Sequence, residues 1–272
     1  MDIGFSGKTI LITGGSSGIG KATVLAAAKE KNLNIAFTYF KNEAGAHDIT
    51  RTIEANGSSA IAVYMDLADH ASIEQAVATV MNKFGQVDVL VNNAVHWGDP
   101  ENRGKIFEEM PLRQWQETIA TNLLGTVKVT QCVVPLMRQQ KWGRIVTVSS
   151  DLAFDSLVGS GPYSSLKSAL VGFTANLVEE LSADGILSNL VLPSWTLTDR
   201  ARAFFPEGID EKLKEAFPTQ RVTVPEDVVS LILYLVSPIN GHVNGEIIRV
   251  TGKASLPLVN HLFKEFMKQS EQ

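Results

Sequence analysis

Short apolar runs alternate with longer amphipathic stretches along most of this chain. The runs are rich in β-branched residues and too short for buried helices, so they predict strands buried on both faces. The stretches between them place apolar residues at helical spacing. Strands are expected near residues 9–13, 33–39, 60–65, 87–92, 144–149, 188–192 and 245–250. Helices are expected near residues 19–31, 43–56, 70–84, 112–140, 163–183 and 225–236.

Strict alternation of strands and helices predicts an α/β fold with a parallel seven-stranded sheet and helices on both faces. No repeat, low-complexity segment or linker interrupts it, so residues 1–272 are expected to form one doubly wound domain. Ligands of such folds gather at the carboxyl ends of the strands. Gly14, Asp66, Asn92 and Ser150 fall at predicted strand ends, which predicts a single site at one edge of the sheet.

Residues 194–220 break the alternation. This segment is irregular in pattern and combines several charges with Trp195, Phe204, Phe205 and Phe217. A long segment between a strand and a helix often forms a lid or a binding loop. We therefore predict a substrate lid here; the alternative is a surface excursion whose aromatic residues pack on the body of the protein.

Composition and charge narrow the possible functions. The chain is 44% hydrophobic and 19% charged, which suits an α/β domain of this length. Its net charge of −5 argues against a nucleic-acid partner. The single cysteine, Cys132, excludes an internal disulfide and fits a reducing compartment, so a cytoplasmic location is expected. The five histidines do not cluster with Asp, Glu or Cys at metal-ligand spacing, so no metal is expected.

Neither the start of the chain nor its apolar runs indicate a membrane. The first residues, MDIGFSGK, lack the basic region and apolar core of a signal peptide. The longest apolar runs, such as residues 231–236, are too short to cross a bilayer. No membrane partner is therefore expected.

A glycine-rich turn between a predicted strand and a predicted helix is a candidate nucleotide site. Gly14, Gly18 and Gly20 follow the pattern G-x3-G-x-G. Glycine allows a tight turn and lets backbone N–H groups approach a pyrophosphate closely. A helix that begins near Ile19 adds the positive end of its dipole. The turn predicts dinucleotide binding, and a purely structural turn is the alternative.

Tyr163 and Lys167 lie four residues apart in the segment YSSLK, and Ser150 precedes the tyrosine. Positions i and i+4 share one face of a helix, and a nearby cation favours the phenolate form of tyrosine. Lowering the pKa of Tyr163 towards roughly 7 requires about 4 kcal/mol, which we expect from the lysine and a positively charged nicotinamide. Ser150 would then hold a carbonyl or hydroxyl oxygen while Tyr163 passes the proton. The alternative is an ordinary amphipathic helix.

Together these motifs resemble the short-chain dehydrogenase/reductase family over about residues 8–252, and within it the 3-oxoacyl-carrier-protein reductases. The resemblance implies an NAD(P)-binding Rossmann-type domain, a homotetramer or homodimer, and hydride transfer. It implies the catalytic residues Asn122, Ser150, Tyr163 and Lys167. The cofactor-binding residues that it implies are Gly14, Ser16, Ser17, Gly18, Ile19, Gly20, Asp66, Leu67, Asn93, Ala94, Tyr163, Lys167, Pro193 and Thr198.

Four positions depart from the family pattern. Val95 and Ser194 stand where the family has glycine, and the final strand ends VTGKAS, which puts the usual subunit contact there in doubt. Asp151 and Asp155 follow the predicted catalytic serine; they either bind a polar or cationic part of a substrate or are solvated loop acids. The residues expected to contact substrate are His96, Trp97 and Trp195.

The end of the second strand bears on the choice of cofactor. Folds of this kind usually bind the ribose 2′-OH of NAD with an acid at that position. Here Tyr39 occupies it and Lys41 follows, so NADP(H) is favoured over NAD(H). Ser17 stands where many NADP-binding relatives carry Arg or Lys, and Lys41 is alternatively a solvated turn residue.

The expected function is NADPH-dependent reduction of a carbonyl on a small or carrier-bound substrate, as in fatty-acid-like or secondary-metabolite synthesis. Oxidation of an alcohol uses the same residues and stays open as the alternative. An enoyl reductase of the superfamily would have its lysine at position 170, where this chain has Leu170. A non-catalytic nucleotide sensor would typically lack the tyrosine or the lysine.

Overall fold

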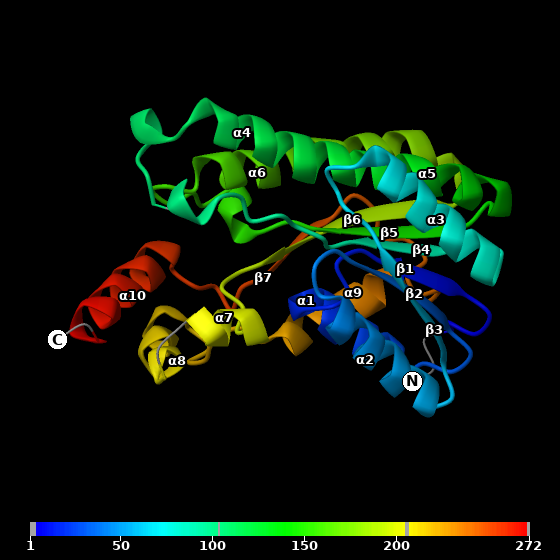
Figure 1. Ribbon diagram of the computed structural model, residues 1–272, viewed down its shortest axis with the longest axis horizontal. Helices are drawn as coiled ribbons and strands as arrows, with labels where there is room; N and C mark the ends of the chain where they lie inside the picture. The colour runs from blue at the N-terminus through cyan, green and yellow to red at the C-terminus, as the bar shows by residue number, and fades with distance from the viewer. Residues whose placement is uncertain (1–3, 103, 205–206, 271–272) are drawn as a thin grey trace.

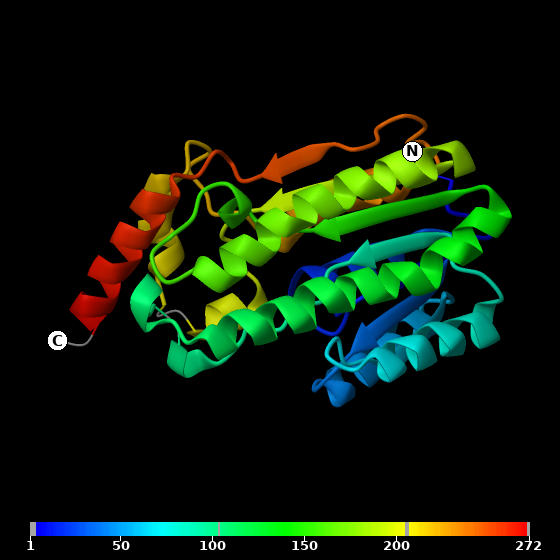
Figure 2. The same cartoon turned by 90° about the horizontal axis from the view of Figure 1, so that it is seen from above.

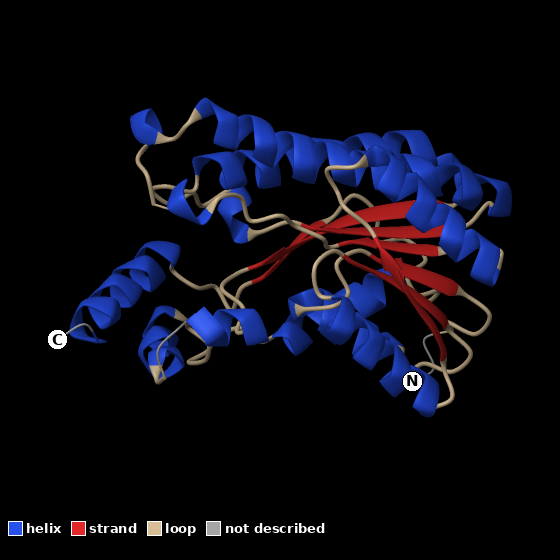
Figure 3. Ribbon diagram, viewed as in Figure 1, coloured by secondary structure: helices blue, strands red, loops and turns tan. Residues whose placement is uncertain are grey.

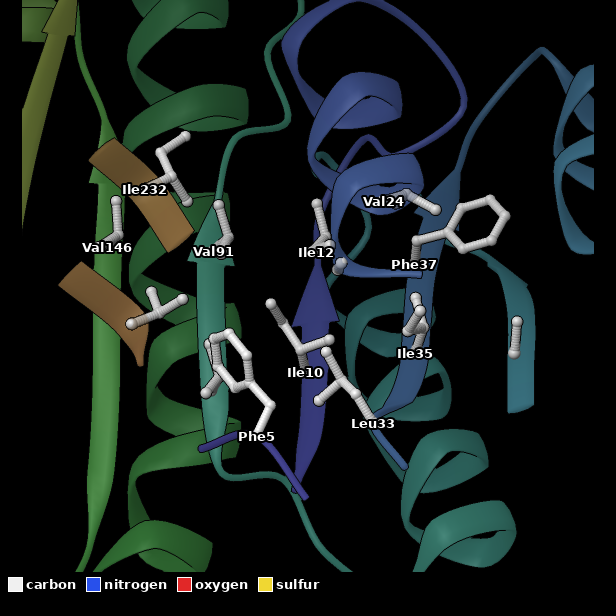
Figure 4. Close-up of a cluster of buried hydrophobic side chains, with 14 of the residues drawn as sticks. Phe5, Ile10, Ile12, Val24, Leu33, Ile35, Phe37, Val91, Val146 and Ile232 are labelled. Atoms are coloured by element: carbon white, nitrogen blue, oxygen red, sulfur yellow. The ribbon is translucent and has the colours of Figure 1, made fainter. Parts of the chain in front are cut away.

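Apolar side chains on both faces of a strand explain why helices cover both faces of the sheet. A computed structural model describes residues 4–102, 104–204 and 207–270 of the chain. In the first strand Ile10 and Ile12 join one apolar cluster and Leu11 joins another, because successive side chains of a strand point to opposite faces. Figure 4 shows the first cluster, where Phe5 and Phe37 pack beside Ile10 and Ile12.

The seven strands form one parallel sheet in the order β3-β2-β1-β4-β5-β6-β7. The strands are β1 (Thr9–Ile12), β2 (Asn34–Tyr39), β3 (Ser59–Tyr64), β4 (Val89–Asn92), β5 (Gly143–Val148), β6 (Ile186–Pro193) and β7 (Ile247–Val250). This confirms the predicted α/β fold and its seven strands. The strand order reverses between β1 and β4, and the crevice at such a reversal is where these folds bind ligands.

Helices cover both faces of the sheet (Figures 1 and 3). The helices are α1 (Gly18–Ala27), α2 (Glu43–Ala55), α3 (His70–Phe84), α4 (Leu112–Thr118), α5 (Gly125–Gln140), α6 (Gly161–Leu181), α7 (Asp199–Phe204), α8 (Ile209–Leu213), α9 (Pro225–Val236) and α10 (Leu256–Ser270). Helices α1, α2 and α9 pack on one face, and α3, α5 and α6 pack on the other.

The segment after β6 is more regular than its sequence pattern indicates. It contains α7 and α8, and the apolar residues of α8 form a small cluster with Phe217 and with Val259 and Leu262 of α10. Helix α10 was not expected from the sequence; it packs on α8 and ends the chain beside this segment, as Figure 2 shows. Phe205, named above in this segment, lies outside the described residues.

Helices α4 and α5 run on from one another through a π-helical turn at Ile119–Leu124. Among the described residues, Leu112–Gln140 is the one helix whose length and composition alone would suffice to cross a membrane, and a third of its most apolar window is buried. The inner face of this helix packs in the second apolar cluster, through Val129, Val133 and Met137. It is thus a packed helix of this domain with a partly exposed apolar side.

Candidate active site

Tyr163, Lys167 and Ser150 meet at the carboxyl end of β5, where α6 begins. The Ser150 hydroxyl lies near enough to Tyr163 to oppose the rise in its pKa. The Lys167 ammonium lies 5.5 Å from the centre of the Tyr163 ring and donates to the Val148 carbonyl at 2.7 Å. Only 5% of Lys167 is exposed, and this burial lowers its pKa to about 8. The structure thus brings together the serine, tyrosine and lysine predicted from the sequence.

Asn122 lies in the π-helical turn between α4 and α5. Its side-chain oxygen accepts from the His96 amide at 2.6 Å, and its side-chain nitrogen donates to the His96 and Thr118 carbonyls at 3.1 Å. A π-turn inside an α-helix costs regular hydrogen bonds and frequently marks a functional site. In this turn the Asn122 side chain binds the Thr118 carbonyl, and it also binds His96 in the loop after β4.

The pKa of Tyr163 in the protein alone bears on the sequence-based expectation, which is that Lys167 and a bound nicotinamide together lower it. In the protein alone, burial and the negative charge of Asp151 raise the pKa above its usual value, against an opposing effect of the Ser150 hydroxyl. The Lys167 ammonium is directed at the Val148 carbonyl. In the protein alone, Tyr163 is therefore a protonated phenol at neutral pH.

Asp151 is the buried acid of this site, with 4% of its surface exposed. It accepts a hydrogen bond from the Ser150 hydroxyl at 3.1 Å. Burial raises its pKa, and its hydrogen bonds partly offset that rise. The Ser194 hydroxyl lies beside the carboxylate, although outside ordinary hydrogen-bond geometry. The interpretation of Asp151 as a solvated loop acid is therefore wrong, whereas Asp155 is half exposed and pairs with Arg249 at 2.6 Å.

Trp97 covers the ring of Tyr163. The two rings are nearly parallel, with centroids 5.4 Å apart and an angle of 15° between their planes. The guanidinium of Arg200 in α7 lies 5.7 Å from the centre of the Trp97 ring. One face of Trp97 is thus buried against Tyr163, while half of the indole stays exposed at the mouth of the site.

The glycine turn after β1 fits a dinucleotide. Gly14 and Gly18 have φ values of 67° and 56°, which side-chain-bearing residues rarely adopt. A Cβ added to Gly20 would lie 2.2 Å from the Gly14 carbonyl oxygen, so only glycine fits there. Ser17 precedes α1, and its side chain does not cap the helix. The first N–H groups of α1 are therefore available to bind a phosphate. Ile19 and Ser16 complete the turn.

Polar contacts hold this turn against its neighbours. The Thr13 hydroxyl accepts from the amides of Asn93 and Ala94 at 2.9 Å, and the Asn93 side chain donates to the Thr13 carbonyl at 2.9 Å. Thr38 accepts from the Gly14 amide at 3.0 Å. Thr13 and Thr38 were not singled out from the sequence, although each stands beside a motif that was. They rigidify the phosphate-binding end of β1.

Towards one side of this edge of the sheet, Asp66 and Leu67 follow β3. One Asp66 oxygen accepts from the Ala68 amide at 2.9 Å, and Leu67 is buried against Gly125. Towards the other side, Pro193 is buried at the end of β6, and Thr198 lies next to Gly18, where an added Cβ would be 3.5 Å from the Thr198 methyl group. The predicted cofactor residues therefore line one continuous edge.

An acid that the sequence argument left out, Glu43 at the start of α2, lies close to the end of β2. The Tyr39 hydroxyl donates to Glu43 at 3.2 Å, and burial followed by this hydrogen bond raises the pKa of Tyr39. Lys41 is exposed and lies 5.4 Å from the ring of Phe40. A positive and a negative side chain thus stand on either side of Tyr39.

Two predicted substrate contacts have local roles in the structure. A ring nitrogen of His96 accepts from the Gly98 amide at 3.3 Å within its own loop. Trp195 packs against the apolar cluster that α8 and α10 form with Phe217. Val95 does not have a positive φ, so its replacement of glycine strains nothing. Within the described part of the chain, no group of three His, Cys, Asp or Glu residues is placed to hold a metal.

A family model described as short chain dehydrogenase matches residues 8–207, so the chain belongs to the short-chain dehydrogenase/reductase family. It is 37% identical over 254 residues to 3-oxoacyl-[acyl-carrier-protein] reductase FabG of Aquifex aeolicus, which covers 93% of this chain and 99% of that protein. A short chain dehydrogenase from Burkholderia cenocepacia in complex with NADP superposes with a TM-score of 0.80 and 31% identity over 91% of this chain and 98% of that one.

A 7α-hydroxysteroid dehydrogenase complexed with NADH and 7-oxo glycochenodeoxycholic acid superposes with a TM-score of 0.84 at 26% identity, over 93% of this chain and 96% of that chain. These similarities agree with the geometry of the site. The protein is an NAD(P)-dependent oxidoreductase of the short-chain family.

Proposed function

We propose that this enzyme reduces a carbonyl group to a secondary alcohol with NADPH, and that Tyr163 donates the proton. The observation that carries the proposal is the Ser150–Tyr163–Lys167 group at the end of β5, in which Ser150 and Lys167 are buried and Tyr163 is partly exposed. A phenol placed beside a hydroxyl can give its proton to a carbonyl oxygen, as reduction requires. The similarity to 3-oxoacyl-carrier-protein reductases supports the same direction.

Each side chain has a definite part in this proposal. Ser150 hydrogen-bonds the substrate carbonyl oxygen, and Tyr163 passes its proton to that oxygen as negative charge develops on it. Lys167 and Asn122 fix the geometry around Tyr163 through their bonds to the Val148 and His96 backbone. The nicotinamide cofactor supplies the hydride when bound. Gly14, Gly18, Asp66 and Thr198, with the other predicted cofactor residues, would hold it.

An apolar hollow beside the start of α6 supports a substrate with an apolar part. It has a volume of about 390 Å³ and is lined chiefly by Ile106, Phe107, Met110, Trp115, Leu157 and Val158. Pro162, which directly precedes Tyr163, closes one side. We propose that the carbonyl substrate extends from Tyr163 past Trp97 into this hollow, beneath residues 194–220 as a lid. A carrier-bound acyl chain would suit such a path.

The test is to follow NADPH absorbance with a panel of carbonyl compounds that includes 3-oxoacyl thioesters, simple ketones and ring ketones. We expect oxidation of NADPH with at least one 3-oxoacyl thioester and loss of that activity in Tyr163→Phe. Turnover restricted to alcohols with NADP⁺ or NAD⁺ would replace this proposal with the oxidative alternative. The cytoplasmic location and the oligomer expected from the sequence are part of the same proposal.

A further inference from the structure

Two positions that depart from the family pattern come together beside the reacting groups. Asp151 follows β5, and Ser194 follows the adjacent strand β6, so both side chains lie at the same edge of the sheet. Both residues are buried, with exposed fractions of 4% and 8%. A buried carboxylate is costly unless hydrogen bonds hold it. Its retention one residue after Ser150 therefore points to a role in the site.

The hydroxyl of Ser150 links Asp151 to Tyr163. Ser150 donates to the carboxylate at 3.1 Å and lies near the Tyr163 phenol, where it opposes the rise in the pKa of that phenol. A hydroxyl has one proton to donate. While Asp151 is ionised, it competes with Tyr163 and with a substrate oxygen for that proton.

We propose that Asp151 is a positioning residue that disfavours the phenolate from which alcohol oxidation would start: its buried carboxylate holds the Ser150 hydroxyl and places a negative charge beside Tyr163. This inference rests on the proposed function for its catalytic meaning. Reduction starts from the phenol and leaves a phenolate, whereas oxidation starts from the phenolate. A negative neighbour therefore favours the first form and disfavours the second.

Few other charges act on Tyr163. Lys167 on the same helix opposes Asp151, but it is directed at the Val148 carbonyl. Arg200 of α7 lies beside the Trp97 ring. Asp155 acts on Asp151 from four residues along the chain. Its charge is largely offset by Arg249. The charge of Asp151 is thus the one that bears most directly on the Tyr163 phenol among the described groups.

The test compares Asp151→Asn with the wild type, using Asp155→Asn as the matched control. Asparagine keeps an oxygen that accepts from Ser150 but removes the charge. Each protein is titrated with base and followed by ultraviolet absorbance, and the signal of Tyr163→Phe is subtracted to isolate the Tyr163 phenolate. The titration is done with and without saturating NADP⁺, and it requires no substrate. We expect Asp151→Asn to form this phenolate about one pH unit or more below the wild type, and Asp155→Asn to match the wild type.

The pH profile of alcohol oxidation should move in the same direction by a similar amount. The inference would be overturned if Asp151→Asn and the wild type formed the Tyr163 phenolate at the same pH. It would also be overturned if neither protein formed it. An equal shift in Asp155→Asn would overturn it too. If Asp151→Asn does not fold, Asp151→Ser replaces it. Because the titration needs no turnover, it still decides the role of Asp151 even if the proposed carbonyl reduction fails.

Discussion

The indole of Trp97 lies nearly parallel to the phenol ring of Tyr163, at 5.4 Å between centroids. This stack places a large, half-exposed aromatic side chain between solvent and the proposed proton donor. A substrate that reaches Tyr163 must pass along or displace Trp97. The loop after β4 therefore controls access to a group carried by α6.

Replacement of Trp97 tests this relationship. Trp97→Ala should lower kcat/KM about tenfold, because a stacked aromatic pair contributes about 0.5–1.5 kcal/mol beyond its burial. Trp97→Phe keeps an aromatic ring and should stay within about threefold of the wild type. Steady-state kinetics on the best carbonyl substrate provide the measurement. Equal activity in wild type and Trp97→Ala would show that the stack does not bear on substrate binding.

Cofactor preference should respond to the charges on either side of Tyr39. Lys41→Ala should weaken NADPH binding by roughly tenfold and leave NADH nearly unchanged, since a partly exposed charge–phosphate contact is worth about 1 kcal/mol. Tyr39→Asp should shift preference towards NADH, because like charges repel. Glu43→Gln should strengthen NADPH binding for the same reason.

Fluorescence titration of both cofactors against each variant checks these expectations. Tighter binding of NADH than NADPH by the unmodified protein would contradict the preference for NADP(H). An unchanged ratio in Lys41→Ala would remove that lysine from the argument, and an unchanged ratio in Glu43→Gln would do the same for Glu43.

The buried amine of Lys167 should make stability depend on pH. Its pKa is about 8 in the folded protein, against about 10.4 for an unfolded lysine. Between these values the unfolded chain binds more protons, so the free energy of unfolding should rise with pH. Lys167→Met lacks this contribution. Between about pH 7.5 and 9.5, the wild type should gain roughly 1–2 kcal/mol relative to Lys167→Met.

Urea denaturation at several pH values measures that difference. The Val148 carbonyl loses its partner in Lys167→Met at every pH, so this loss cancels from the slope. The raised pKa of Tyr163 acts with the opposite sign above about pH 10, which is why the window ends below that value. Parallel stability curves for the two proteins would show that Lys167 keeps an ordinary pKa.

The oligomer expected from the sequence should use the exposed side of α4 and α5 together with α6. Leu112, Ile119 and Leu124 are exposed there, with fractions of 71%, 37% and 48%. Leu124→Glu should therefore dissociate a dimer or tetramer, because it places a charge in an apolar contact. Tyr234→Glu on α9 is the matched control. Light scattering at micromolar concentration decides, and a monomeric wild type would refute the expectation.

Much of the fold follows from local pattern, because strands buried on both faces and amphipathic helices have different periods. All seven strands and the helices at 43–56, 70–84 and 225–236 were predicted to within about two residues. Helix α10 was missed because its apolar residues Val259 and Leu262 pack on α8 and Phe217, within a segment that itself looked irregular. The apolar pattern of α10 can be interpreted only once the segment on which it packs is known.

The residues of the site could be predicted where a sequence motif identifies them. The properties that depend on burial in the fold could not. Ser150, Tyr163 and Lys167 were found from their spacing and residue types. The raised pKa of Tyr163 in the protein alone was not predicted, because the sequence shows neither that Lys167 turns to Val148 nor that Asp151 is buried. Burial of Asp151 depends on β5 and β6 lying side by side, which no local pattern reports.

The central claim is that Tyr163 donates the proton in carbonyl reduction, and the rate of NADPH oxidation by Tyr163→Phe tests it most directly. The variant should lose roughly 10²–10⁴ in kcat on a 3-oxoacyl thioester, the usual contribution of a positioned acid. Its melting temperature and NADPH affinity should stay near those of the wild type, since phenylalanine preserves the stack on Trp97. A variant that retains near-full turnover would contradict the account.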